Sequence, residues 1–100
     1  MESTDEVISQ KRQLFQKDIS NLPLFKERIE NIFSTEFIDV FPDILKIPQL
    51  DFINYVITGV KNSLSDLYDI DQIFQNEKFL NIFSSCTKNI ENKYTKYFET

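Results

Sequence analysis

The chain has 100 residues, of which 41% are hydrophobic and 27% charged, and its formal net charge is −5. This composition predicts one globular domain over residues 1–100 and excludes a disordered tail. No apolar window of about 18 residues is present, so we expect no transmembrane helix and no membrane partner. The acidic start of the sequence does not resemble a signal peptide.

The amino-acid composition indicates the cellular compartment of the protein and the base composition of its genome. Cys86 is the single cysteine, which excludes an internal disulfide and favours a reducing, cytoplasmic setting. Alanine is absent, and Gly, Arg and Pro together supply six residues, whereas Phe, Tyr, Met, Ile, Asn and Lys supply 45. Because the latter six have AT-rich codons, we expect an AT-rich genome: a parasite, a low-GC bacterium, or a virus or phage of one.

Helical spacing dominates the chain, and a single glycine leaves almost no material for hairpin turns. The first helix is predicted to begin at Ser3, where Ser3 and Glu6 form a capping-box pattern, and to end near Ile19. Its apolar residues are Val7, Ile8, Leu14, Phe15 and Ile19, and its lysines and arginine are expected to face water.

The second helix is predicted to run from about Pro23 to Phe33. Continuing it would place Glu36 within its apolar face, so we expect a break at Ser34 or Thr35 and a short third helix to about Phe41. The stretch from Pro42 to Ile47 is then a connector with at most one helical turn.

A long helix is predicted from Pro48 to about Leu67. One apolar row follows the 3.6-residue period. It comprises Leu50, Ile53, Val56, Ile57, Val60, Leu64 and Leu67. A second, narrower row contains Phe52, Tyr55, Gly59 and Ser63. It predicts either a close helix crossing at the glycine or an exposed groove that receives a partner side chain.

The C-terminal third is predicted to be helical from a turn at residues 68–71 to about Tyr97, with a bend near Asn76. Asp69 or Asp71 would be the N-cap after the turn. An apolar stripe with a spacing of three to four residues could dock in its own bundle or assemble with a second chain. The possible assembly stripe comprises Phe79, Phe83, Ile90, Tyr94 and Tyr97, and Cys86 lies within it.

Several kinds of catalysis are excluded by residue type. Histidine is absent, which removes Ser-His-Asp and Cys-His catalysis, and no glycine-rich phosphate loop occurs. Cys86 is expected to be a buried, inert thiol. Glu36 with Asp39 or Asp43 could form a carboxylate pair, but such pairs arise by chance in acidic chains, and we expect no enzyme.

The acidic residues between 66 and 77 do not follow a calcium loop. A loop starting at Asp69 would place Phe74 at the glycine position and Leu80 at the bidentate glutamate position. We therefore expect neither a metal nor another cofactor.

Charge is distributed unevenly along the chain. Residues 1–35 carry a net charge of −1, residues 36–77 of −6 and residues 78–100 of +2. A negative middle disfavours nucleic acid as a partner, because phosphate contacts need Lys and Arg. If the two acidic groups that flank the long helix meet at one end, they form a single patch for a basic protein partner. These residues are Glu36, Asp39, Asp43, Asp66, Asp69 and Asp71.

The sequence thus predicts an all-α, compact bundle of four to five helices with a long C-terminal helical segment. The expected function is protein–protein interaction, as an inhibitor, immunity factor or accessory subunit that binds a basic surface. One alternative is a structural subunit that assembles with itself through the C-terminal helix, for example as a homodimer. A weaker alternative is a nucleic-acid contact module that uses the basic tail with Tyr94 and Tyr97.

Overall fold

A computed structural model describes residues 4–99 and contains α-helices, one short 3-10 turn and, over this range, no strand. The elements are α1 (Thr4–Ile19), α2 (Leu22–Val40), η1 (Phe41–Asp43), α3 (Gln49–Leu67), α4 (Ile70–Ile73) and α5 (Glu77–Tyr97). The predicted all-α bundle with a long C-terminal helix is confirmed. The proposed cap Ser3 lies outside the described residues. No helix in the described part is long and apolar enough to cross a bilayer.

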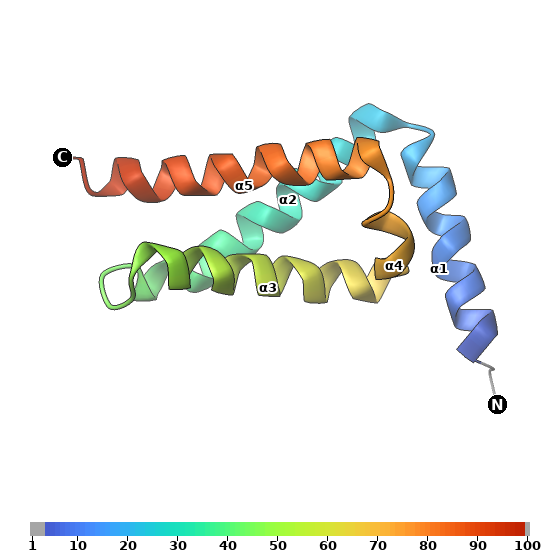
Figure 1. Ribbon diagram of the computed structural model, residues 1–100, viewed down its shortest axis with the longest axis horizontal. Coiled ribbons are helices and arrows are strands. Elements are labelled where there is room, and N and C mark those ends of the chain that lie inside the picture. Colours follow the sequence, from blue (N-terminus) through green and yellow to red (C-terminus); the bar gives the residue numbers. More distant parts are fainter. Residues whose placement is uncertain (1–3, 100) are drawn as a thin grey trace.

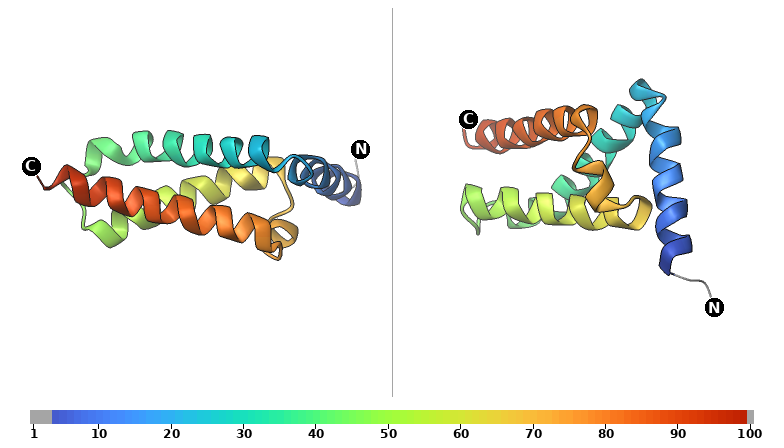
Figure 2. Two further views of the ribbon diagram at one scale, coloured as in Figure 1. Left: turned by 90° about the horizontal axis from the view of Figure 1, so that it is seen from above. Right: turned by 45° about the vertical axis from the view of Figure 1, so that its right-hand side comes forward.

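The three long helices α2, α3 and α5 pack against one another, and α1 lies across one end of them (Figure 1, Figure 2). The chain runs along α2 to the far end, returns along α3, turns through α4 and runs back along α5. The three helices therefore alternate in direction. The connector with η1 and the end of α5 lie together at the end opposite α1 (Figure 1).

The predicted break at Ser34 or Thr35 is wrong, because α2 continues without interruption to Val40. Neither residue breaks the hydrogen-bond ladder, and the ladder contains no interior glycine or proline. Glu36 does not have to be buried in the apolar core either, since it meets Gly59 and Ser63 of α3 at the helix crossing. The segment expected as a third helix is the last part of α2, and η1 is the helical turn of the connector.

The α3 helix begins directly after Pro48 and ends at Leu67, as predicted. Ile53, Val56, Val60 and Leu64 are buried, which confirms the central row. Leu50 is the exception, with 71% of its surface exposed, because it lies in the first turn of α3 and faces an open hollow shared with Glu91 of α5. The prediction that Leu50 belongs to the core is wrong.

The segment between α3 and α5 is a full break rather than a bend. Asp69 is the N-cap residue of the short α4, and the chain then turns through residues 74–76. Asn76 caps α5, since its side-chain oxygen accepts a hydrogen bond from the Phe79 amide at 3.0 Å. The polar stretch around Asn76, where a bend was predicted, is therefore the start of α5 with a recognisable N-cap.

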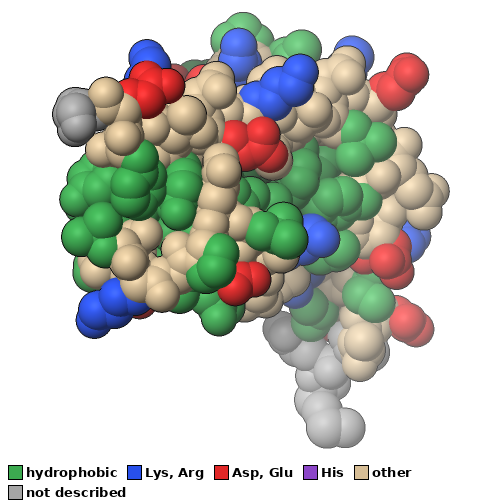
Figure 3. Space-filling view, turned by 60° about the vertical axis from the view of Figure 1, so that its left-hand side comes forward, with side chains coloured by type: hydrophobic (Ala, Val, Ile, Leu, Met, Phe, Trp, Pro, Cys, Tyr) green, Lys and Arg blue, Asp and Glu red, His purple; other side chains and the backbone are tan. Residues whose placement is uncertain are grey.

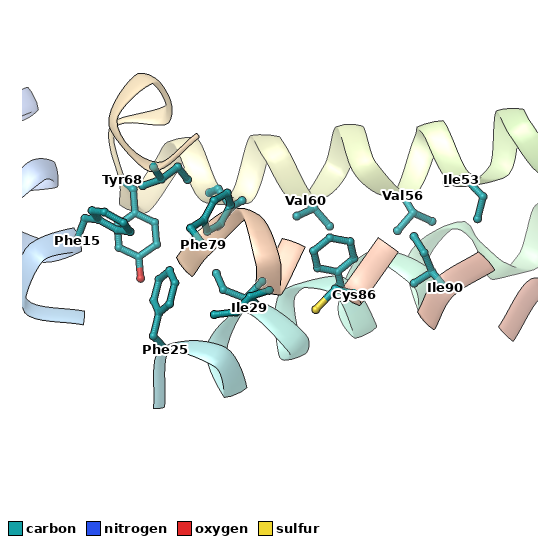
Figure 4. Close-up of a cluster of buried hydrophobic side chains, with 14 of the residues drawn as sticks. Phe15, Phe25, Ile29, Ile53, Val56, Val60, Tyr68, Phe79, Cys86 and Ile90 are labelled. Atoms are coloured by element: carbon teal, nitrogen blue, oxygen red, sulfur yellow. The ribbon is translucent and has the colours of Figure 1, made fainter. Parts of the chain in front are cut away.

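Aromatic rings gather in the core at the end of the bundle next to α1 (Figure 4). Phe15 of α1, Phe25 of α2 and Tyr68 after α3 meet with ring centroids 5.7–6.0 Å apart. Phe74 and Phe79 continue this cluster toward α5, with a centroid separation of 5.0 Å. These edge-to-face contacts join four parts of the chain that are distant in sequence.

The apolar stripe of α5 packs mostly within its own bundle. Phe79, Cys86 and Ile90 are buried, and Phe83 and Tyr94 are partly buried against the same core. Only Tyr97 of the possible assembly stripe is exposed. Of the two alternatives for this stripe, docking in its own bundle therefore describes most of its length.

Val60 offers a test of the core. It is fully buried among α2, α3 and α5, so Val60→Asp would place an unpaired carboxylate there at a cost of several kcal/mol. We expect this variant to lose its helical far-ultraviolet circular dichroism. Leu50→Asp is the matched control on the same helix and should fold normally. Wild-type thermal stability of Val60→Asp would contradict this core.

Candidate functional site

A groove of about 760 Å³ lies between α2 and α3, closed at one end by α1. We call it the α2–α3 groove. It is lined by Leu14, Leu24, Glu27, Arg28, Asn31, Ile32, Thr35, Glu36, Ser63 and Leu67. No residue of α5 lines it, because α5 packs on other faces of α2 and α3. The groove therefore lies where a fourth long helix would complete the bundle.

The walls of the groove are apolar, and its charges are mostly negative. Leu24 is 62% exposed, and Ile32 and Leu67 are partly buried. Two carboxylates, Glu27 and Glu36, line the same groove. Exposed leucine next to carboxylates suits an amphipathic partner that carries both apolar and cationic side chains.

Glu36 lies at the crossing of the two helices. Ser63 Oγ donates a hydrogen bond to Glu36 Oε1 at 3.2 Å. The other oxygen of Glu36 lies over Gly59, where any Cβ atom would overlap it. Each interpretation of the Gly59 row thus holds in part: a side chain of α2 packs directly over the glycine, and Ser63 of the same row lines the open groove.

A cluster of three polar side chains joins α1, α2 and α3 beside the groove. The Tyr68 hydroxyl donates a hydrogen bond to Asp18 Oδ2 at 2.6 Å, and Arg28 Nη1 donates to the same oxygen at 2.6 Å. Arg28 Nη1 also lies 3.2 Å from the Tyr68 hydroxyl oxygen. Arg28 is therefore already paired, and it leaves the negative charge of Glu27 and Glu36 largely uncompensated.

This cluster changes the acid–base behaviour of its members. Burial, and then the hydrogen bond to Asp18, raise the pKa of Tyr68 to about 12, while Arg28 acts in the opposite direction. The hydrogen bond with Tyr68 raises the pKa of Arg28 above its ordinary value. Sequence reasoning missed this cluster because its members are 10 to 50 residues apart and belong to no motif.

The six acidic residues proposed as one patch do not come together. Asp39 and Asp43 precede α3, and Asp69 and Asp71 follow it, so the two groups are separated by a helix about 28 Å long (Figure 1). Because α3 joins the two acidic groups, they lie at opposite ends of this helix, and the prediction of a single patch is wrong. Glu36 alone lines the α2–α3 groove.

The charge of the acidic group at the end of α3, Asp66, Asp69 and Asp71, is also partly neutralised. Arg12 Nε lies 2.7 Å from Asp69 Oδ2, and Lys11 Nζ donates to the Ser65 carbonyl oxygen at 2.8 Å. Both bases were expected to face water. The Arg12 side chain does remain 57% exposed while it pairs with Asp69, whereas Lys11 is partly buried against the end of α3. Asp66 and Asp71 remain exposed.

The residues of the basic tail contribute to packing. Tyr94 contacts Phe52, with 5.2 Å between ring centroids, and Lys93 Nζ lies 5.5 Å from the centre of the Phe37 ring. Cys86 is buried, and this burial raises the pKa of its thiol. Among residues 4–99, no group of three or more acidic or cysteine side chains is placed to hold a metal ion.

Comparisons with protein-family models, with curated proteins and with solved structures give no match for this chain. Candidate functions therefore rest on the geometry of its own surface.

The crossing at Gly59 makes a double-mutant test possible. Gly59→Ala gains roughly 0.5–1 kcal/mol of helix propensity but displaces the Glu36 carboxylate from Ser63. In a Glu36→Ala background that space is open. We expect the effect of Gly59→Ala on the free energy of unfolding to be about 1 kcal/mol more favourable there, as measured by urea denaturation. Additive effects would contradict the contact.

The Tyr68 cluster predicts a loss of stability at high pH. The folded pKa of Tyr68, about 12, lies above the ordinary value of 10.0, so the fold favours the protonated hydroxyl. This stabilisation of about 2–3 kcal/mol is complete below pH 10 and is lost as pH rises through 12. Urea denaturation at these two pH values gives the decrease in the free energy of unfolding. We expect this decrease to be smaller for Tyr68→Phe than for the wild type. An identical loss in both proteins would show that another group is responsible.

Proposed function

We propose that this chain is a non-catalytic protein-binding protein that holds a basic, amphipathic segment of its partner in the α2–α3 groove. The observation that carries the proposal is the combination of exposed Leu24 and uncompensated Glu27 and Glu36 in one groove. A partner helix could bury its apolar face against the leucines. Its lysine or arginine would then pair with Glu36 near the centre of the groove.

The proposal retains the predicted basic partner and changes the surface that binds it. Of the six acidic residues proposed from the sequence, Glu36 takes the central part, while the other five have no place in the groove lining. The roles considered from the sequence, as inhibitor, immunity factor or accessory subunit, are all compatible with such a surface, because each acts by occupying a partner.

The test is site-specific photo-crosslinking in cells of the source organism. A benzophenone amino acid at Thr35, which is exposed in the groove, should crosslink the chain to a protein partner. The same amino acid at Ser85, which is exposed on α5 and outside the groove, is the positional control. Equal crosslinking to the same proteins from both positions would contradict binding in the groove.

Charge variants test the role of Glu36. Glu36→Gln keeps an oxygen that can accept from Ser63, so the fold should persist while crosslinking from Thr35 falls about tenfold. Asp66→Asn removes an exposed carboxylate outside the groove and should leave the yield unchanged. If Asp66→Asn lowers the crosslinking yield and Glu36→Gln does not, the result would contradict the groove and indicate that the partner binds an acidic surface at the end of α3.

A further inference from the structure

The end of the bundle opposite α1 exposes large hydrophobic side chains. They come from η1, the connector, the start of α3 and the end of α5, and each is between 38% and 72% exposed. We call this surface the apolar end, and it comprises Phe41, Leu45, Leu50, Tyr97 and Phe98. Figure 3 shows hydrophobic side chains gathered on this side of the molecule.

The aromatic side chains of the apolar end contact one another, and its two leucines lie in the connector and in the first turn of α3. The ring centroids of Phe41 and Tyr97 are 5.3 Å apart, and those of Tyr97 and Phe98 are 5.2 Å apart. Phe98 shares a shallow hollow with Gln49, the residue before Leu50. The rings are thus already held in position, and a partner would find a preorganised surface.

From these contacts we propose that the apolar end is a two-fold symmetric interface between two copies of this chain. It is independent of the α2–α3 groove and of the buried stripe of α5, sharing only Tyr97 with that stripe. In such an interface each residue meets the same patch of the other copy, so the surface must be complementary to itself.

Charges of both signs surround the apolar end, which suits a second copy of this chain. Lys46, Lys93 and Lys96 lie in or next to the elements that carry it, together with the carboxylates of Asp39, Asp43, Asp51 and Glu99. Glu91 of α5 also lines a hollow with Leu50. In a two-fold arrangement, acids of one copy can pair with lysines of the other.

The exposed area is sufficient for a reversible dimer. With about 200 Å² for a fully exposed large side chain, the five residues expose on the order of 500 Å² together. Two copies would bury on the order of 1,000 Å², which is the lower limit of specific interfaces. The expected dimer is therefore weak and dissociates on dilution through the micromolar range.

Sedimentation equilibrium of the full chain tests this interface. We expect the wild type to change from monomer to dimer as its concentration rises from low to high micromolar. Leu45→Glu and Leu50→Glu each place a carboxylate on the exposed surface, so the fold should persist while the dimer dissociation constant rises about tenfold or more.

The control is Leu24→Glu at a leucine of the α2–α3 groove that is 62% exposed, and it should leave the dissociation constant unchanged. Circular dichroism must show that all three variants are folded. A wild type that stays monomeric at high micromolar concentration would overturn the proposal. A dimer weakened by Leu24→Glu but not by Leu45→Glu or Leu50→Glu would also overturn it, because it would place the interface in the groove.

Discussion

The arrangement of this bundle depends on the large size of its core side chains. The chain has no alanine and one glycine, so its helices meet through larger side chains, mainly phenylalanine and isoleucine, with Val56, Val60 and Leu64 on α3. Gly59 is the one exception, and the space that a Cβ atom would fill accommodates the carboxylate of Glu36 from α2. The position of this carboxylate in the α2–α3 groove therefore depends on Gly59.

Periodicity was sufficient to predict the parts of the fold that bury a continuous apolar row. The α3 helix was predicted at both ends because Pro48 precedes it and its row from Ile53 to Leu64 has no interruption. The course of α2 was not predictable, since a one-dimensional pattern treats Glu36 as a polar residue on an apolar face. Whether such a residue is tolerated depends on what another helix places opposite it, here Gly59 and Ser63.

The candidate site shows the same limit of sequence reasoning. Glu36 was singled out, but for an acidic patch that the course of α3 divides between two ends of the molecule. The groove itself has no sequence signal, because its lining comes from α1, α2 and α3 at irregular intervals. The Tyr68 cluster has none either, as its oxygen and nitrogen atoms meet only after three helices have packed.

The way α1 is attached gives this fold a weakly held element. Phe15 is its one fully buried side chain among the described residues, while Leu14 and Ile19 are only partly buried against the core. Polar links join Lys11 to Ser65, Arg12 to Asp69, and Asp18 to Arg28 and Tyr68. Sub-global opening begins at elements that bury little apolar area, so amide hydrogens of α1 are expected to exchange before those of the three long helices. Since Leu14 of α1 lines the groove, such opening would widen it while α2, α3 and α5 stay folded. The groove would thus have one adjustable wall and two rigid ones.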